Sequence, residues 1–308
     1  MKLAIGVDLG GTDIKVGVMD RPGVLLKKAT LPTRAADGPD QALDRLAEHI
    51  RELARRLGLR TDEIAAIGVG APGPIDRDAG VLIAAPNLPG WENTKICPRL
   101  SVALGAPVSL ENDANAAAFG EFAHRIAAGE RISSMVLFTL GTGVGGGVVI
   151  DRRLVRGSYD SAGEIGHMIV EADGRKCPCG QSGCLERYAS ATGISATFQE
   201  RGGAAVQMTR DICSKAERGD PIAMGAFDVA AKMLAIAIIN LQHLLNPELI
   251  ALGGGVAAAG NVLLEPVRRY ARELTWRLVD DLPRIELAVA GNDAGMLGAA
   301  ALALTNQQ

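Results

Sequence analysis

The sequence has few aromatic residues and no excess of positive charge. Phe, Tyr and Trp together make up 3% of the 308 residues, so stacking surfaces for nucleic-acid bases are scarce. The 32 basic and 35 acidic side chains leave a formal net charge of −3, which gives no electrostatic reason to expect nucleic acid or an anionic membrane as a partner. Apolar residues make up 48% of the chain, so a largely disordered chain is excluded.

The sequence also lacks a clear targeting or membrane-spanning segment. The apolar stretch at residues 3–7 is shorter than that of a signal peptide. The most apolar internal segment, residues 233–245, is interrupted by Asn240, Gln242 and His243, and we interpret it as too short and too polar to span a bilayer. We therefore expect a cytoplasmic protein.

Cysteine is sparse and odd in number, which argues against a disulfide framework. Cys97 and Cys213 stand apart and are given no role. The other three follow a histidine in an H-x₉-C-x-C-x₄-C pattern, formed by His167, Cys177, Cys179 and Cys184. Three thiolates and one imidazole would fill a tetrahedral zinc site and leave no open position for catalysis. The alternative is three reduced cysteines without a metal.

Strand-like and helix-like patterns alternate along the chain, which predicts an α/β fold. Strands are expected at residues 3–7, 14–19, 23–30, 64–69, 108–110, 135–140, 148–150, 248–252 and 285–290. Helices are expected at residues 39–57, 113–128, 261–279 and 294–304, with a further helix between Asp220-Pro221 and Asn246-Pro247. The first three strands are antiparallel in character.

A weak internal repeat joins the two halves of the sequence. Near the start of the chain, the turn Gly10-Gly11-Thr12 lies between two predicted strands. In the middle, the turn Gly141-Thr142-Gly143 again lies between two predicted strands. Either copy alone could be an ordinary tight hairpin. Together they suggest a duplicated architecture that holds phosphates, because glycine lets backbone N–H groups approach an anion. A third cluster, which includes Gly254 and Gly255, fits close approach to a nucleotide. The P-loop pattern is not matched at any of the three.

Two polar segments could carry chemistry. In Asn112-Asp113 the ordinary reading is helix capping. The functional reading is that Asp113, kept ionised by the helix dipole, accepts the proton of a substrate hydroxyl while Asn112 binds a neighbouring hydroxyl. Glu164 and His167 are three residues apart, so on a helix they would share a face and could bind vicinal hydroxyls, or form only a surface pair.

Four motifs in order resemble one family. They are Asp8-Leu9-Gly10-Gly11-Thr12, Glu111-Asn112-Asp113-Ala114-Asn115, Gly163-Glu164-Ile165-Gly166-His167, and the cysteine segment from Cys177 to Glu186. Together they are similar to the ROK family of sugar kinases and repressors, and within it to the glucokinase branch. The resemblance runs over essentially the whole chain, and its cysteine segment is the most specific part.

The resemblance implies a two-lobed actin/hexokinase-like (ribonuclease H-like) fold with an interlobe cleft. The small lobe would comprise residues 1–112, completed by residues 294–308, and the large lobe residues 113–293. ATP would lie across the two glycine turns, with its nucleoside near Gly254 and Gly255. Magnesium, a structural zinc and a homodimer or homotetramer are also expected. Asp113 matches the catalytic base, and the sugar-binding positions are Gly73, Asn87, Asn112, Asp113, Glu164, His167 and Glu186.

One departure and several alternatives stay open at this level. Asp13 stands where family members often carry Lys or Asn, and a carboxylate there would repel phosphate unless magnesium or Lys15 offsets it. The expected reaction is ATP-dependent phosphorylation of glucose to glucose 6-phosphate. The alternatives are a kinase for mannose, fructose, N-acetylglucosamine or N-acetylmannosamine, the use of ADP or polyphosphate as donor, a sugar-responsive regulator, and a sugar-binding protein without activity. A regulator would be expected to carry a helix-turn-helix segment before the first strand.

Overall fold

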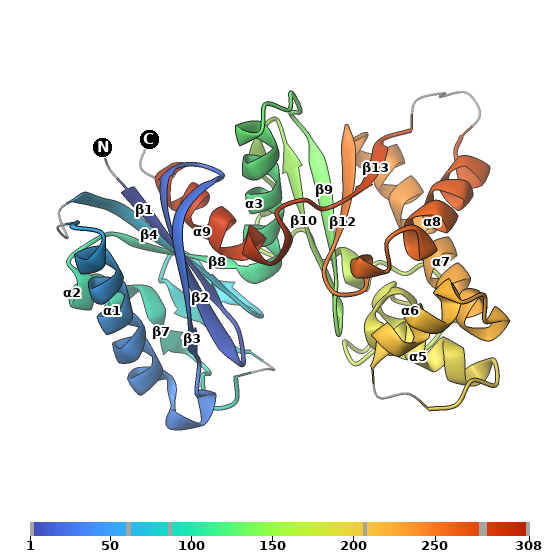
Figure 1. Ribbon diagram of the computed structural model, residues 1–308, viewed down its shortest axis with the longest axis horizontal. Coiled ribbons are helices and arrows are strands. Elements are labelled where there is room, and N and C mark those ends of the chain that lie inside the picture. Colours follow the sequence, from blue (N-terminus) through green and yellow to red (C-terminus); the bar gives the residue numbers. More distant parts are fainter. Residues whose placement is uncertain (1–2, 60–62, 86–87, 206–207, 277–281, 306–308) are drawn as a thin grey trace. The chain divides into compact units, whose positions relative to one another are not determined.

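The computed structural model describes residues 3–59, 63–85, 88–205, 208–276 and 282–305. Its contacts divide the chain into two compact units. The first comprises Met1–Arg131, Leu154–Ala162 and Asn292–Gln308, and the second comprises Ile132–Arg153 and Gly163–Gly291. Each unit is built around a five-stranded sheet with helices on it (Figure 1).

The sheet of the first unit has the strand order β3-β2-β1-β4-β8. The first three strands are antiparallel neighbours, as predicted, and β4 and β8 continue the sheet in parallel. The strands are β1 (Leu3–Leu9), β2 (Asp13–Arg21), β3 (Val24–Pro32), β4 (Ile64–Ala71) and β8 (Val108–Asn112). A small separate sheet contains β5 (Ile75–Asp76), β6 (Val81–Leu82) and β7 (Thr94–Lys95). β1 and β4 are apolar almost throughout because helices cover both faces.

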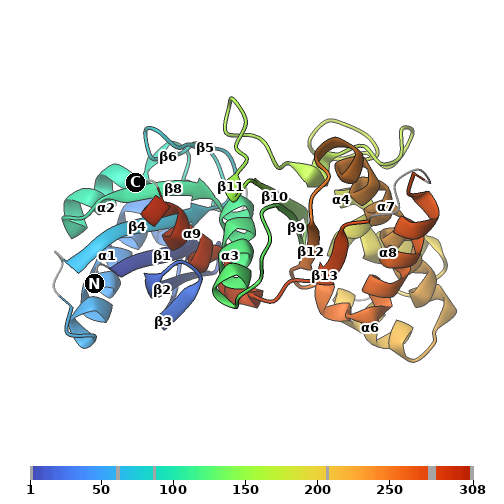
Figure 2. The same ribbon diagram turned by 90° about the horizontal axis from the view of Figure 1, so that it is seen from above.

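Helices lie on either side of this sheet. They are η1 (Ala35–Asp37), α1 (Pro39–Arg56), α2 (Ile96–Leu104), α3 (Asp113–Ala127), η5 (Gly291–Asp293) and α9 (Ala294–Thr305). α1 buries Leu43, Leu46 and Ile50 on one face, as the helical spacing predicts. α3 lies alongside α9, as Figure 2 shows, and the two approach so closely that a Cβ on Gly120 or Gly298 would collide with the other helix's backbone.

The sheet of the second unit repeats the same plan, with the order β11-β10-β9-β12-β13. β9 and β10 form an antiparallel hairpin, and β12 and β13 follow in parallel. The strands are β9 (Met135–Leu140), β10 (Val144–Ile150), β11 (Arg153–Leu154), β12 (Leu249–Gly253) and β13 (Arg284–Leu287). The helices are η3 (Ile165–His167), α4 (Glu186–Ala189), α5 (Ala191–Glu200), α6 (Thr209–Glu217), α7 (Pro221–Leu245), η4 (Ala257–Ala259) and α8 (Asn261–Leu274). The internal repeat predicted from the two glycine turns is therefore present as two hairpins at corresponding places.

α7 is longer than the apolar segment singled out in the sequence. Its 25 residues and hydropathy of 2.0 would suffice for a membrane span by length and composition alone. However, 61% of its most apolar window is buried, and α7 packs against α5, α6 and α8. Asp220 caps its first turn by accepting from the N–H groups of Ile222 and Ala223. These are the features of a central helix in a folded core.

Several boundaries differ from expectation. β10 begins at Val144 and not at residue 148, because its central glycines resemble a turn in the sequence but pair with β9. α8 ends at Leu274, short of the expected residue 279. The contact division also groups α3 with the first unit, although the lobe boundary was expected at residue 112. The packing of α3 against α9 and β4 is the physical reason.

Candidate functional site

The junction between β8 and α3 places the first predicted site residues. Asn112 ends the strand and caps the helix, with its Oδ1 accepting from Ala114 N at 2.9 Å and Asn115 N at 3.1 Å. Its Nδ2 donates to the carbonyl of Gly73 at 3.3 Å. The capping role is therefore present, and the same side chain links the junction to the Gly73 loop. Gly73 has φ +85°, a conformation that favours glycine.

Asp113 is the first residue of α3 and is half-buried. Its Oδ1 accepts from Ala114 N at 2.8 Å. The N-terminus of a helix favours negative charge, so this position stabilises the ionised carboxylate. The carboxylate is half-buried at a strand–helix junction, and it is not sealed in the core.

A buried carboxylate before this junction was missed from the sequence. Glu111 is 5% exposed, and its Oε2 accepts from Arg156 Nε at 2.8 Å. Its Oε1 accepts from Asn112 N at 3.2 Å and from Asn115 Nδ2 at 3.5 Å. Glu111 and Arg156 are 45 residues apart, so no local spacing could reveal the pair. The pair holds the backbone that carries Asp113.

The predicted phosphate turn of the first unit connects β1 and β2. The N–H of Gly10 donates to Asp13 O at 3.0 Å, which closes the hairpin around Gly11 and Thr12. Lys15 lies on the same strand as Asp13, but its Nζ forms an ion pair with Asp8 at 3.1 Å. The ion pair recorded for Lys15 thus goes to the carboxylate before the turn and not to Asp13.

The predicted nucleotide residues of the second unit are brought together. The 141–143 turn joins β9 to β10, with the N–H of Gly141 donating to Gly143 O at 2.9 Å. Gly254, with φ +86°, follows β12 and lies against the end of β9, where a Cβ would collide with the backbone of Leu140. The N–H of Val256 donates to the carbonyl of Leu140 at 2.9 Å. Two glycine segments that are remote in sequence therefore share one edge of this sheet, and Gly255 lies exposed beside them.

Glu186 begins α4 next to this edge. Its Oε2 accepts from the N–H of Val144, the residue that follows the turn, at 3.0 Å. Gly143 is in such close contact that a Cβ there would overlap the same carboxylate. A residue predicted to bind sugar is thus bonded to the backbone at the predicted phosphate turn.

Glu164 lies directly before η3, and His167 is its last residue. Glu164 is exposed, and its carbonyl accepts from the N–H of His167 at 3.0 Å. Only His167 belongs to this short 3₁₀ turn, and Glu164 precedes it, so the continuous helix on which a shared face was predicted is not present here. Glycines explain the position of the turn: Gly146 leaves room for the side chain of Ile165, and Gly166 lies against the backbone of Val144.

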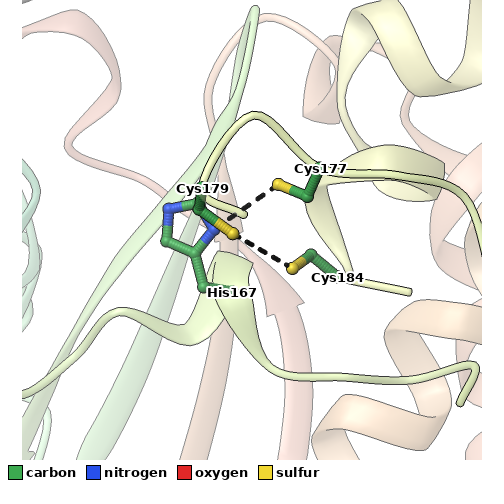
Figure 3. Close-up of side chains that lie close together, drawn as sticks. All are labelled: His167, Cys177, Cys179 and Cys184. Atoms are coloured by element: carbon green, nitrogen blue, oxygen red, sulfur yellow. Dashed lines mark hydrogen bonds between the residues drawn. The ribbon is translucent and has the colours of Figure 1, made fainter. Parts of the chain in front are cut away.

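His167 and the three cysteines converge, as Figure 3 shows. One ligand atom from each of the four residues lies within 4.8 Å of the others. The Nδ1 of His167 is 3.9 Å from the Sγ of Cys177, and the Sγ atoms of Cys179 and Cys184 are 3.6 Å apart. A tetrahedron of zinc ligands has edges of about 3.5–3.8 Å. Because Nδ1 faces the cluster, the Nε2 edge of the ring faces away from it.

The thiol chemistry also fits a metal. Hydrogen bonding from the backbone of Gln181 lowers the pKa of Cys179, whereas burial raises the pKa of Cys184 to about 12. Adjacent thiolates without a cation repel one another, and a bound divalent cation removes that cost. The three sulfurs and one imidazole nitrogen therefore match the donor set of a structural zinc site.

Arg175 anchors the cysteine loop (residues 168–185) from a second side. Its guanidinium donates to Arg187 O at 2.7 Å and to Thr197 Oγ1 at 2.9 Å, and lies over the ring of Tyr188. The N–H of Arg175 is 2.9 Å from the Tyr188 hydroxyl. Nothing in the sequence separates this arginine from the other basic residues, so it was missed.

The predicted sugar-binding residues fall in both units. Gly73, Asn112 and Asp113 belong to the first, and Glu164, His167 and Glu186 belong to the second. Asn87 lies outside the described residues.

The two sheets have the same strand plan, and each carries a glycine turn between its first two strands, as the resemblance to a two-lobed kinase fold implies. The sequence profile of the ROK family matches residues 4–306. The chain belongs to the ROK family, which confirms the resemblance inferred from its motifs.

Named relatives and solved structures agree with this assignment. The glucokinase of Halalkalibacterium halodurans is 36% identical over 310 residues, covering 96% of this chain and 92% of that protein. The crystal structure of a ROK hexokinase from Thermus thermophilus has a TM-score of 0.84 at 36% identity, covering 99% of both chains. A ROK glucokinase from Streptomyces griseus, solved with glucose and AMPPNP, has a TM-score of 0.80 at 31% identity, covering 98% of this chain and 99% of that one. The fold is therefore the two-lobed, actin-like fold of these kinases.

Other members of the family carry other names. An N-acetyl-D-glucosamine kinase of Escherichia coli is 33% identical over 98% of this chain and 99% of that protein. A ROK family transcriptional regulator has a TM-score of 0.81 at 25% identity, and the match covers 98% of this chain and 78% of the regulator. The family alone does not fix the substrate.

Proposed function

We propose that this protein is a sugar kinase that transfers the γ-phosphoryl group of ATP to the 6-hydroxyl of glucose. Asp113 carries the proposal: it is a half-buried carboxylate in the first turn of α3, in a chain that is 36% identical to a glucokinase over 96% of its length. The glucose and AMPPNP bound to the Streptomyces griseus relative support the same substrate pair.

In this proposal Asp113 orients the 6-hydroxyl and accepts its proton late in the transfer. Asn112, Asn87, Glu164, His167 and Glu186 hold the other hydroxyls, and Gly73 lines the sugar with its backbone. The Nε2 edge of His167 is free of the cysteine cluster and can face a hydroxyl.

The glycine turns bind the nucleotide. N–H groups of Gly10, Gly11 and Thr12 and of Gly141, Thr142 and Gly143 offer donors to the phosphates, and Gly254 and Gly255 lie near the nucleoside. Magnesium would neutralise phosphate charge, and the charged groups beside the first turn include Lys15, Asp8 and Asp13.

The cysteine cluster has a structural part in the proposal. His167, Cys177, Cys179 and Cys184 would hold zinc, which fixes the loop between Glu164 and Glu186. A cytoplasmic location follows from the use of ATP, and a homodimer or homotetramer remains a prediction.

A donor and acceptor panel tests the proposal. Purified protein is assayed by coupled detection of the spent donor, with ATP, ADP or polyphosphate and with glucose, mannose, fructose, N-acetylglucosamine or N-acetylmannosamine. We expect the highest kcat/KM with ATP and glucose. A higher value with an N-acetylhexosamine would assign the protein to another branch of the family. Sugar binding without any transfer would favour a regulator or a sugar-binding protein.

A further inference from the structure

Three hydrogen bonds join the 141–143 turn to the α4–α5 junction (residues 186–192). The N–H of Ala191 donates to Gly141 O at 2.8 Å. The hydroxyl of Thr192 donates to Thr142 O at 3.2 Å. The carboxylate of Glu186 accepts from the N–H of Val144 at 3.0 Å. The junction therefore holds the carbonyl groups of Gly141 and Thr142 and the exit of the turn, while Gly143 O accepts from the N–H of Gly141 within the turn.

These bonds set the direction of the N–H groups in the turn. In a planar trans peptide the C=O of one residue and the N–H of the next point in opposite directions. Because the carbonyls of Gly141 and Thr142 point at the α4–α5 junction, the N–H groups of Thr142 and Gly143 point away from it. Two aligned N–H groups form the kind of concavity that binds phosphate oxygens.

The junction itself is tightly built. Ser190 is fully buried, and its hydroxyl donates to Glu186 O at 2.6 Å and accepts from Gly193 N at 3.0 Å. The hydroxyl oxygen of Thr192 is 2.9 Å from the hydroxyl oxygen of Ser190. The junction begins two residues after Cys184 of the cysteine cluster. A rigid segment thus runs from the cluster through Glu186 to the turn.

We propose that the α4–α5 junction aims the N–H groups of the 141–143 turn at the phosphate donor, and that Thr192 is a positioning residue for that donor. This inference rests on the proposed kinase function. Thr192 acts on ATP through Thr142, and the hydrogen bonds given for its hydroxyl go to Thr142 and Ser190. Glu186, by contrast, is assigned to the sugar and also accepts from the turn. One junction therefore serves both substrates, through two different side chains.

The test separates the two substrates. Initial rates are measured for Thr192→Val with ATP varied at saturating glucose and with glucose varied at saturating ATP. A neutral hydrogen bond lost from the turn should raise the KM for ATP by about 3- to 10-fold, and the KM for glucose should stay within about 2-fold of the starting protein. Glu186→Gln should raise both KM values. Thr192→Ser keeps the hydroxyl and should restore the KM for ATP.

Ser195→Ala is the matched control, because its hydroxyl lies on the same helix 3.3 Å from Thr209 Oγ1. It should change neither KM. Zinc content and the thermal midpoint of every variant show whether the fold is intact, and Thr192→Ala replaces the valine variant if that one unfolds. An unchanged KM for ATP in Thr192→Val, or an equal rise in both KM values, would overturn the inference.

Binding of AMPPNP by calorimetry keeps the inference separate from the proposed function. If the wild-type protein transfers phosphate to none of the sugars, the kinase proposal fails. The Thr192→Val variant should still bind AMPPNP about 3- to 10-fold more weakly than wild type if the junction positions the turn. Equal binding by the two proteins would contradict the inference alone.

Discussion

The two glycine hairpins are alike in their backbone and differ in what holds them. In the first unit, the hydroxyl of Thr33 donates to Gly10 O at 2.6 Å and the N–H of Thr33 donates to Thr12 O at 2.8 Å. In the second unit, one N–H and one threonine hydroxyl again hold two carbonyls of the turn, but they come from Ala191 and Thr192. The same two kinds of donor are therefore used in both turns, but they hold different carbonyls and come from unrelated segments.

The difference lies in burial and charge. Thr33 is fully buried beside its own sheet, whereas Thr192 is exposed. The second turn also receives a carboxylate, Glu186, that the first turn lacks among the contacts described above. The first turn is thus held by the core of its unit, and the second by a segment that we assign to the sugar. The comparison predicts that the first unit contributes the catalytic carboxylate, part of the sugar site and a rigid turn, and that the second unit contributes only substrate binding.

The largest effect on catalysis, a fall in kcat, is expected from Asp113→Asn in the first unit. Glucose binding measured by calorimetry should stay largely intact, while kcat falls by ~10²–10⁴-fold, the usual scale for loss of a general base. Asn keeps the size of the side chain and removes its ability to accept a proton. Near-normal turnover in this variant would remove Asp113 from the catalytic role.

The counterpart in the second unit is Glu164→Gln. If Glu164 binds a sugar hydroxyl, the KM for glucose should rise by roughly 10- to 100-fold, because a hydrogen bond to a charged group is lost, while kcat changes less. Glu171→Gln on the neighbouring loop is the matched control, since Glu171 is also exposed and has no assigned role. A fall in kcat at unchanged KM would reverse the proposed division between the units.

A smaller rise in the KM for glucose is expected from Cys179→Ser. Zinc content measured by mass spectrometry should fall, and the KM for glucose should rise by roughly 10-fold, because displacement of a binding group by about 1 Å is costly. Cys213→Ser is the control, because Cys213 lies outside the cluster. An unchanged glucose affinity in zinc-free protein would separate the cluster from the sugar site.

The sequence predicted features that depend on local spacing. The cysteine cluster follows from four residues within one segment, and their ligand atoms do converge. The capping role of Asn112 and the position of Asp113 at the start of α3 likewise follow from adjacent residues. The hairpins were found because the same glycine and threonine pattern occurs twice.

What the sequence did not predict depends on contacts between distant residues. Glu111 and Arg156 pair only because the fold returns residues 154–162 to the first unit. The start of β10 was misplaced because glycines carry no side chain from which strand alternation can be read. The donors Thr33 and Thr192 are ordinary threonines in the sequence, and their role exists only through the carbonyls that they meet.

The smallest effect on activity, and the sharpest test of the two hairpins, comes from Thr33→Val compared with Thr192→Val. In the first, the carbonyl of Gly10 loses its donor at a fully buried side chain, so the free energy of unfolding should fall by about 1–3 kcal/mol. In the second, water can replace the exposed hydroxyl, so stability should change by less than about 0.5 kcal/mol. Thermal or denaturant unfolding measures both, and Thr33→Ser, which keeps the donor, should lie close to wild type. Equal losses of stability in the two valine variants would mean that both turns are held by their cores, and the difference between the units would then rest on Glu186 alone.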